Sequence, residues 1–191
     1  MLRYRQRRPL RILDFDIETL AAGYADPDWV PHKITAAAWS WIGEPDVESL
    51  LTDKDGFFNA ATRGRRLGPL LSAIGEADIV TGHNILRFDL PVLNAECLRS
   101  GLPSLNPLRV IDTIRLPKTK GLKKGQDNLS GILGGEEQKK ALTWFEWDEA
   151  HETNRWPIVR ERVVSDVVQH KETFELMRLR GWLRQPRVWA P

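Results

Sequence analysis

The sequence predicts an α/β fold in which a mixed central sheet is flanked by helices. Strand-like segments come first, at residues 10–17, 34–42 and 47–51. After them, segments with helical periodicity alternate with short strand-like segments through the rest of the chain. The sequence contains no repeat and no dividing linker, so this order indicates one domain with a mixed rather than a purely parallel sheet.

Alternating apolar residues define the two long strands, and a loop separates them. Residues 10–17 are Leu-Arg-Ile-Leu-Asp-Phe-Asp-Ile, and residues 34–42 are Ile-Thr-Ala-Ala-Ala-Trp-Ser-Trp-Ile. Both patterns are typical of strands. The connecting loop, 21–33, has the length and the Gly, Asp and Pro content of a binding loop. Leucines at helical spacing predict a helix at about 56–73, which Gly68-Pro69 should break or restart.

Short strands and helices alternate in the second half of the chain. Two strands are expected at 78–81 and 109–114, and three helices at 89–99, 128–133 and 156–183. The last helix is long and amphipathic, and Gly134-Gly135 closes the short one before it. The Lys- and Gly-rich segment 117–127 is expected to be a mobile basic loop.

The length and composition indicate one soluble domain. With 191 residues, 41% of them hydrophobic, the chain can bury a full core, which we assign to residues 10–183. Residues 1–9 form a basic N-terminal tail, and residues 184–191 form a C-terminal tail that is either disordered or packed on the body. No apolar run approaches the roughly 18 residues that a membrane span needs, and the N-terminus lacks a signal stretch. We therefore expect a cytoplasmic protein.

Basic residues are clustered although the net charge is only +2. Such clusters suit a phosphate backbone, but a basic run is more commonly a solvated face. In the expected basic loop, Lys120, Lys123 and Lys124 are candidate nucleic-acid contacts. The single Cys97 excludes an internal disulfide and a cysteine-based zinc site.

Several acidic residues lie at positions where an ionised carboxylate is energetically unfavourable. Asp14, Asp16 and Glu18 alternate along the first strand and therefore share one face, which is unfavourable unless a cation or solvent relieves the repulsion. A solvent-exposed strand end is the simpler interpretation of any single Asp-x-Glu. Asp166 lies among valines of the last helix, where an acid needs a partner. That partner is either a metal ion or an arginine such as Arg162 or Arg160.

Three segments resemble the exonuclease motifs of the DEDD (DnaQ-like) superfamily, most closely the proofreading domains of family B DNA polymerases. They are Asp-Ile-Glu-Thr-Leu at 16–20, Gly-His-Asn-Ile-Leu-Arg-Phe-Asp at 82–89 and Val-Ser-Asp-Val at 164–167. Asp112-Thr113 and the segment 129–134 are further similarities. The resemblance spans about residues 10–180 and implies a ribonuclease H-like fold.

The resemblance also implies a set of site residues and an activity. Asp16, Glu18, Asp89 and Asp166 would be catalytic and would hold two divalent ions; oxygen ligands suit Mg²⁺ or Mn²⁺. Thr19, Leu20, Asn84 and Phe88 would contact the 3′-terminal nucleotides. The implied activity is 3′→5′ hydrolysis of single-stranded DNA by a two-metal mechanism, in DNA repair, replication or phage-like metabolism. A replication or repair protein is a further candidate partner.

One position departs from the superfamily pattern. The superfamily places a His or Tyr general base shortly before the last Asp, where this chain has Glu161 and Arg162. Arginine stays protonated, so Glu161 and the nearby His151 are the candidate stand-ins. Three other functions remain open: an RNA 3′ exonuclease, a catalytically weakened module that binds nucleic-acid ends, and another ribonuclease H-like nuclease such as a structure-specific endonuclease.

Overall fold

The computed structural model describes residues 8–20, 32–52 and 60–191. At its centre lies a six-stranded sheet with the order β3-β2-β1-β4-β5-β6. The strands are β1 (Ile12–Leu20), β2 (Lys33–Trp41), β3 (Glu48–Leu51), β4 (Ile79–Gly82), β5 (Leu108–Asp112) and β6 (Arg187–Trp189). The pairs β1–β4 and β4–β5 are parallel, and the other three pairs are antiparallel. The predicted α/β fold with a mixed sheet is confirmed.

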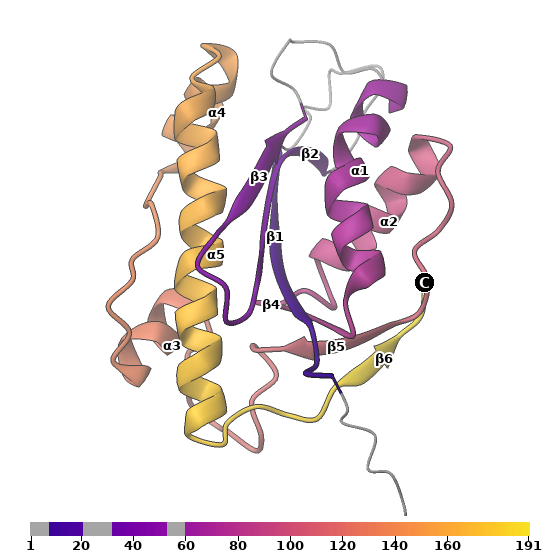
Figure 1. The fold of residues 1–191 in the computed structure, drawn as a ribbon. Coiled ribbons are helices and arrows are strands. Elements are labelled where there is room, and N and C mark those ends of the chain that lie inside the picture. The colour runs from indigo at the N-terminus through magenta and orange to yellow at the C-terminus, as the bar shows by residue number, and fades with distance from the viewer. Residues whose placement is uncertain (1–7, 21–31, 53–59) are drawn as a thin grey trace, which may run out of the picture.

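Helices cover both faces of the sheet (Figure 1). They are α1 (Ala60–Glu76), α2 (Asp89–Arg99), α3 (Gln126–Leu133), α4 (Trp144–Glu152) and α5 (Trp156–Leu179). The long helix α5 packs on β1, β2 and β3, with α3 and α4 beside it, whereas α1 and α2 lie on the opposite side. Among the described residues, no helix is both long and apolar enough to cross a membrane.

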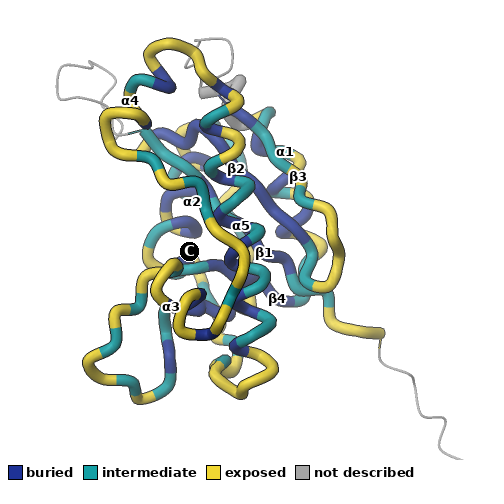
Figure 2. The backbone as a smooth tube through the Cα atoms, turned by 90° about the vertical axis from the view of Figure 1, so that its left-hand side faces the viewer, coloured by how far each residue is buried: buried dark blue, intermediate teal, exposed yellow. Residues whose placement is uncertain are grey.

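The alternation along β1 decides which side chains reach each layer. Leu13, Phe15 and Ile17 are buried in the core with α1 and α2, so the residues between them point toward α5. A second core joins β2 and β3 to α4 and α5, and the central strands are buried along most of their length (Figure 2). The acidic residues of β1 thus face α5 from inside the molecule.

Two helices differ from the sequence prediction. The described part of α1 runs through Pro69 without a break, because Pro69 lies on its exposed face, where water can solvate the carbonyl left unpaired. Helix α4 was not predicted. Its N-cap Thr143 forms a capping box with Glu146, a Thr-x-x-Glu signal that the sequence contains.

The C-terminal segment packs back on the body. Helix α5 ends at Leu179, earlier than expected, and Gly181 follows in the left-handed conformation (φ 73°). The N–H of Trp182 bonds the carbonyl of Met177 at 2.8 Å, which together with the Gly181 conformation forms a Schellman motif. Residues 187–189 then form β6 along the edge of β5, so the expected tail supplies an edge strand.

Candidate metal centre

Three carboxylates from two elements meet on the α5 face of the sheet. Asp16 and Glu18 alternate along β1, so both side chains leave the strand on this face. Asp166 comes from α5, which packs against β1. One oxygen from each carboxylate lies within 4.8 Å of the others. The structure therefore brings three of the four predicted ligands together, and we call these three residues the acid cluster.

Asp89, the fourth predicted ligand, lies beside the acid cluster. It is the first residue of α2 and is buried, and its Oδ1 accepts a hydrogen bond from the Ile17 N–H at 3.2 Å. Its negative charge also raises the pKa of Asp16. Because Ile17 lies between Asp16 and Glu18, this bond ties the start of α2 to the strand that carries the cluster.

Burial raises the pKa values of all four carboxyl groups, and repulsion within the group adds to the rise at Asp16, Glu18 and Asp89. Burial is the largest cause for Glu18, whose pKa rises to about 7 as Asp166 adds to the shift and Arg162 opposes it. Burial likewise raises the pKa of Asp89 to about 7. The pKa of Asp16 lies well above its ordinary value through burial and then the neighbouring charges, and burial also raises the pKa of Asp166. A cation at the acid cluster would offset these costs.

The donor set fits a divalent cation. All the candidate ligand atoms are carboxylate oxygens, the donors that Mg²⁺ and Mn²⁺ prefer. Within the described part of the chain, Asp166 Oδ1 is buried and has no hydrogen-bond partner. A buried charged oxygen without a partner is costly, and coordination to a metal ion would remove that cost. The acid cluster is therefore a candidate site for metal ions.

Arg162, which stands near the position of the superfamily's general base, contacts two carboxylates of the acid cluster. Its Nε lies 3.1 Å from Glu18 Oε1 and 3.2 Å from Asp166 Oδ2, and its Nη1 donates to the Lys140 carbonyl. The arginine partner that the sequence allowed for Asp166 is therefore present. Arg160, the other candidate, is exposed on α5.

Neither stand-in for the base is brought to the acid cluster. Glu161 points outward and pairs with Lys140 at 3.2 Å, with 58% of its side chain exposed. His151 is a buried residue of α4, and its Nδ1 contacts the Trp147 carbonyl at 2.8 Å while its Nε2 contacts Thr35 Oγ1 at 3.0 Å. Burial lowers the pKa of His151. Both ring nitrogens of His151 are therefore engaged, Nδ1 within α4 and Nε2 with Thr35 of β2.

A cleft with aromatic walls opens beside the acid cluster. This cavity of about 330 Å³ is lined by Glu18 and Arg162 and also by Thr19, Phe88 and Trp144. Trp144 is 83% exposed. We call this cavity the aromatic cleft. It contains two of the four residues predicted to touch the 3′-terminal nucleotides, Thr19 and Phe88.

The other predicted nucleic-acid contacts lie elsewhere. Leu20 packs into the core between the sheet and α5. Asn84 lines a different cavity, together with Lys124. Lys120 and Lys123 are exposed outside both cavities.

A buried polar chain underlies the acid cluster and was not predicted. Asp14 Oδ1 lies 2.8 Å from His170 Nδ1, and His170 Nε2 lies 2.8 Å from Thr113 Oγ1. Thr113 Oγ1 in turn lies 3.0 Å from His83 Nδ1. The signal in the sequence was the spacing of His170, four residues after Asp166 and so on the same face of α5.

Comparison with known proteins identifies the fold. No protein-family model and no curated protein matches the sequence. A solved family B DNA polymerase from the hyperthermophilic archaeon Pyrobaculum calidifontis is similar in structure, with a TM-score of 0.63 and 20% identity. The match covers 90% of this chain and 24% of the polymerase chain, so the chain spans about a quarter of that protein's length. The chain has a ribonuclease H-like α/β fold.

Proposed function

We propose that the chain is a metal-dependent 3′→5′ exonuclease that hydrolyses phosphodiester bonds at the 3′ ends of single-stranded DNA. The observation that supports this is the position of Glu18, which belongs to the acid cluster and also lines the aromatic cleft. A terminal nucleoside held in the cleft would have its phosphate next to the candidate metal ligands. The motif resemblance supports the same arrangement.

The walls of the aromatic cleft suit an unpaired nucleobase. Phe88 and the exposed Trp144 offer flat apolar surfaces on which any base can stack. The acid cluster, by contrast, repels phosphate unless cations neutralise it. A module that only binds nucleic-acid ends would gain nothing from these acids, so their presence favours a catalytic role.

The chain's own residues would hold and orient the reacting groups. Asp16, Glu18 and Asp166 would hold two divalent ions, with Asp89 as a fourth ligand. Bound in such a site, divalent ions polarise the phosphodiester and lower the pKa of water. Arg162 can neutralise charge on the phosphate, but it cannot accept a proton. We assign no proton transfer to Glu161 or His151, because their side chains are directed to other partners.

The test is a cleavage assay on single-stranded DNA and RNA labelled at the 5′ end, with Mg²⁺ or Mn²⁺. We expect a ladder that shortens from the 3′ end and that requires the metal. Asp16→Asn and Glu18→Gln should each lower the rate roughly a hundredfold or more, since both remove charge stabilisation at the reacting centre. Faster cleavage of RNA than DNA would redirect the proposal to an RNA 3′ exonuclease.

Glu175→Gln is the matched control. Glu175 lies nine residues beyond Asp166 on α5, and its carboxylate is paired with Arg178 at 2.6 Å. The same chemical change there should leave the rate unaltered. Cleavage that persists in Asp16→Asn, or binding without cleavage by the wild type, would refute the exonuclease. The second outcome would instead identify a binding module.

A further inference from the structure

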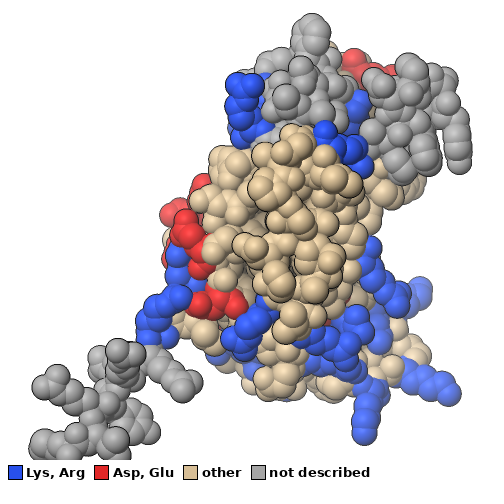
Figure 3. All heavy atoms as spheres, turned by 90° about the vertical axis from the view of Figure 1, so that its right-hand side faces the viewer, with Lys and Arg blue, Asp and Glu red and all other residues tan. Residues whose placement is uncertain are grey.

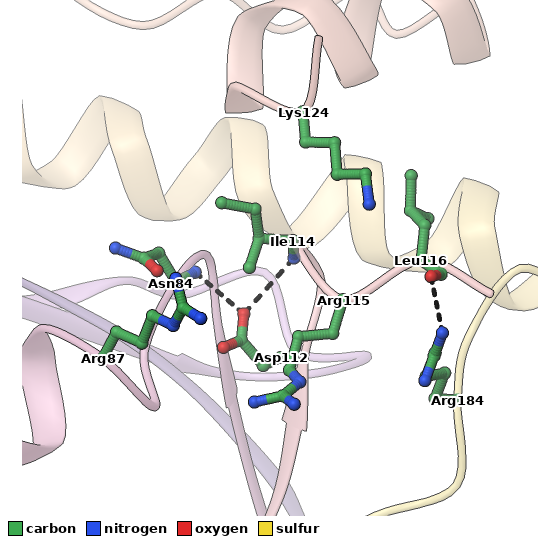
Figure 4. A pocket seen from close by; sticks show the side chains of 8 residues that line it. All are labelled: Asn84, Arg87, Asp112, Ile114, Arg115, Leu116, Lys124 and Arg184. Carbon is green, nitrogen blue, oxygen red and sulfur yellow. Dashed lines mark hydrogen bonds between the residues drawn. The ribbon is translucent and has the colours of Figure 1, made fainter. Parts of the chain in front are cut away.

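A second cavity, lined by cations, includes residues of the turn that immediately precedes Phe88. It encloses about 350 Å³ between residues 84–87, which follow β4, and residues 114–116, which follow β5. Figure 4 shows Lys124 and Arg184 reaching it from two further segments. Its four basic residues are Arg87, Arg115, Lys124 and Arg184, and we call it the basic pocket.

The acid at the base of the basic pocket is already engaged by the backbone. Asp112 is buried, and its Oδ1 accepts the N–H groups of Asn84 at 2.9 Å and Ile114 at 3.3 Å. Its Oδ2 accepts the N–H of Leu86 at 3.3 Å. These bonds hold the turn in place, including Asn84 in the left-handed conformation (φ 65°). Asp112 thus shapes the pocket, and one acid faces four cations.

The cations themselves are available to a ligand. Within the described residues, none of the four forms a salt bridge with a carboxylate, although the charge of Arg115 lowers the pKa of the nearby Asp112. Arg184 donates only to the Leu116 carbonyl, at 2.8 Å. Arg87 and Arg184 are exposed, while Arg115 and Lys124 are half-buried. On the face shown in Figure 3, Lys and Arg side chains gather at the lower right, whereas the acidic side chains at the left lie beside further basic ones.

The lining specifies a phosphate group rather than a base. Among the residues that the structure describes, no aromatic ring lines the basic pocket, whose uncharged lining residues are Asn84, Ile114 and Leu116. A nucleobase would find no stacking surface there. Guanidinium groups bind the paired oxygens of a phosphate in a bidentate geometry, and lysine adds a point charge.

The turn connects the basic pocket to the proposed catalytic site. Arg87 and Phe88 are neighbours in the chain, yet Arg87 lines the basic pocket and Phe88 lines the aromatic cleft. Asp89 follows at once and contacts the strand of the acid cluster. A strand whose 3′ end lies in the cleft can cross this turn and present an internal phosphate to the pocket.

We propose that the basic pocket binds an internal phosphodiester of the single strand whose 3′ end lies at the acid cluster. This inference rests on the proposed function for the identity of the strand. Arg87 and Arg115 would then bind the strand, and the carboxylates of the acid cluster would serve its hydrolysis.

The experiment measures equilibrium binding of a fluorescent single-stranded oligonucleotide in EDTA, where no cleavage occurs. Arg87→Ala and Arg115→Ala should each weaken binding roughly tenfold, as loss of a charged hydrogen bond does. Each should also lower the slope of log K against log salt by about one. Arg109→Ala is the control, because Arg109 is exposed on β5 and outside the pocket. Thermal melting verifies that all variants are folded.

A scan with single neutral methylphosphonate linkages then locates the phosphate. In the wild type one internal position should be most sensitive, and in Arg115→Ala that position should lose its excess sensitivity. Equal losses at every position, or losses no larger than that of Arg109→Ala, would overturn the inference. Inorganic phosphate that binds with the same dependence on Arg115, while oligonucleotide affinity does not change, would also overturn it in favour of a free-phosphate site.

These results are independent of the cleavage assay. A wild type that cleaves DNA but shows no pocket dependence refutes this inference alone. Pocket-dependent binding without metal-dependent cleavage refutes the exonuclease alone.

Discussion

Four carboxyl groups of this protein, those of the acid cluster and Asp89, lie close together and have raised pKa values. Asp89 and Asp166 are buried, and Asp16 and Glu18 are half-buried. For an acid whose pKa is higher in the folded state than in the unfolded state, the folded state binds more protons between the two values. The free energy of unfolding therefore falls as pH rises through that interval and is constant above it. For Glu18 the interval runs from 4.5 to about 7.

The first prediction concerns this pH dependence. Without metal, the wild type should lose stability as pH rises from about 4.5 to about 7, whereas Glu18→Gln should not lose this contribution. The free energy of unfolding of the variant should therefore rise relative to that of the wild type over this interval. At roughly 1.4 kcal/mol per pKa unit, this relative rise should be on the order of 3 kcal/mol. Denaturant unfolding at several pH values measures it. Added Mg²⁺ should stabilise the wild type more at high pH, because metal ligands must be deprotonated. A stability difference between Glu18→Gln and the wild type that does not change with pH would contradict a raised pKa of Glu18 in the folded protein.

A second prediction concerns Arg162, the cation that the acid cluster already has. Arg162→Gln removes the partner of Glu18 and Asp166, so the metal-free protein should be less stable. With no arginine competing for the carboxylates, the rise in melting temperature caused by Mn²⁺ should be larger than in the wild type. Arg160→Gln, an exposed change on the same helix, should alter neither quantity. If Mn²⁺ raised the melting temperature of Arg162→Gln and of the wild type equally, Arg162 would not compete with the metal ion, and its role would be limited to its contact with the Lys140 carbonyl.

Residues that belong to short motifs could be predicted from the sequence. The Asp16 and Glu18 alternation and the motif resemblance were enough to select the acids that the structure assembles. The arginine partner of Asp166 is also local, since Arg162 precedes it by one turn of α5. The contacts of Arg162 with Glu18 and of His170 with Asp14 were not predicted, because both side chains reach β1 only through the packing of α5. Glu161 was selected by its position in the motif, but the rotation of α5 directs it to Lys140.

At the scale of elements, the end of β4 must approach β1 closely. A Cβ at Gly82 would lie 3.0 Å from the Phe15 carbonyl oxygen and 3.0 Å from Ile85 Cδ1. Phe15 directly precedes Asp16 in the chain. The glycine of the second motif is therefore explained by packing against the strand that carries the acid cluster.

Gly82→Ala should accordingly disturb both the fold and the site. The added methyl group must displace backbone of β1, which should cost about 1 to 3 kcal/mol. We expect a lower melting temperature and a smaller stabilisation by Mn²⁺. Gly68→Ala is the control, because a Cβ there meets nothing within 4 Å; in a helix this change should be neutral or stabilising. Equal melting temperatures and equal stabilisation by Mn²⁺ in the two variants would contradict the close approach of β4 to β1 at Gly82.

Helix α4 could not be predicted from the periodicity of the sequence. Its capping box was legible in the sequence, but its buried residues, among them Trp147 and His151, do not form a long apolar stripe. The helix is held instead by contacts across the chain, such as the bond from Trp147 Nε1 to the Thr19 carbonyl at 3.3 Å. Periodicity cannot reveal a helix that is stabilised mainly by contacts to distant strands.

At the scale of the whole molecule, the sheet order joins segments that are distant in sequence. Strand β6 lies at the edge, where it pairs with β5, and Trp189 packs against the core shared with α1 and α2. The edge of β5 is thereby covered, which protects it from pairing with other chains.

The last prediction tests this edge. Trp189→Ala removes a partly buried aromatic side chain and should lower the free energy of unfolding by about 2 kcal/mol, less than for a fully buried tryptophan. Exposure of β5 should also increase aggregation on heating, measured by light scattering. Val188→Ala, at a position with 74% exposure in the same strand, should have a much smaller effect. Equal losses in the two variants would contradict a specific role for Trp189.

The sequence by itself determined the fold class, most of the strands and helices, and the acids of the candidate metal centre, because periodicity and short motifs record local geometry and local chemistry. Only the tertiary structure decided which side chains surround those acids. It placed Arg162 rather than Glu161 at the acid cluster, directed His151 into the core, and opened a basic pocket from four separate segments. These outcomes depend on the rotation of α5 and on the order of strands in the sheet, which arise from contacts between residues far apart in the chain.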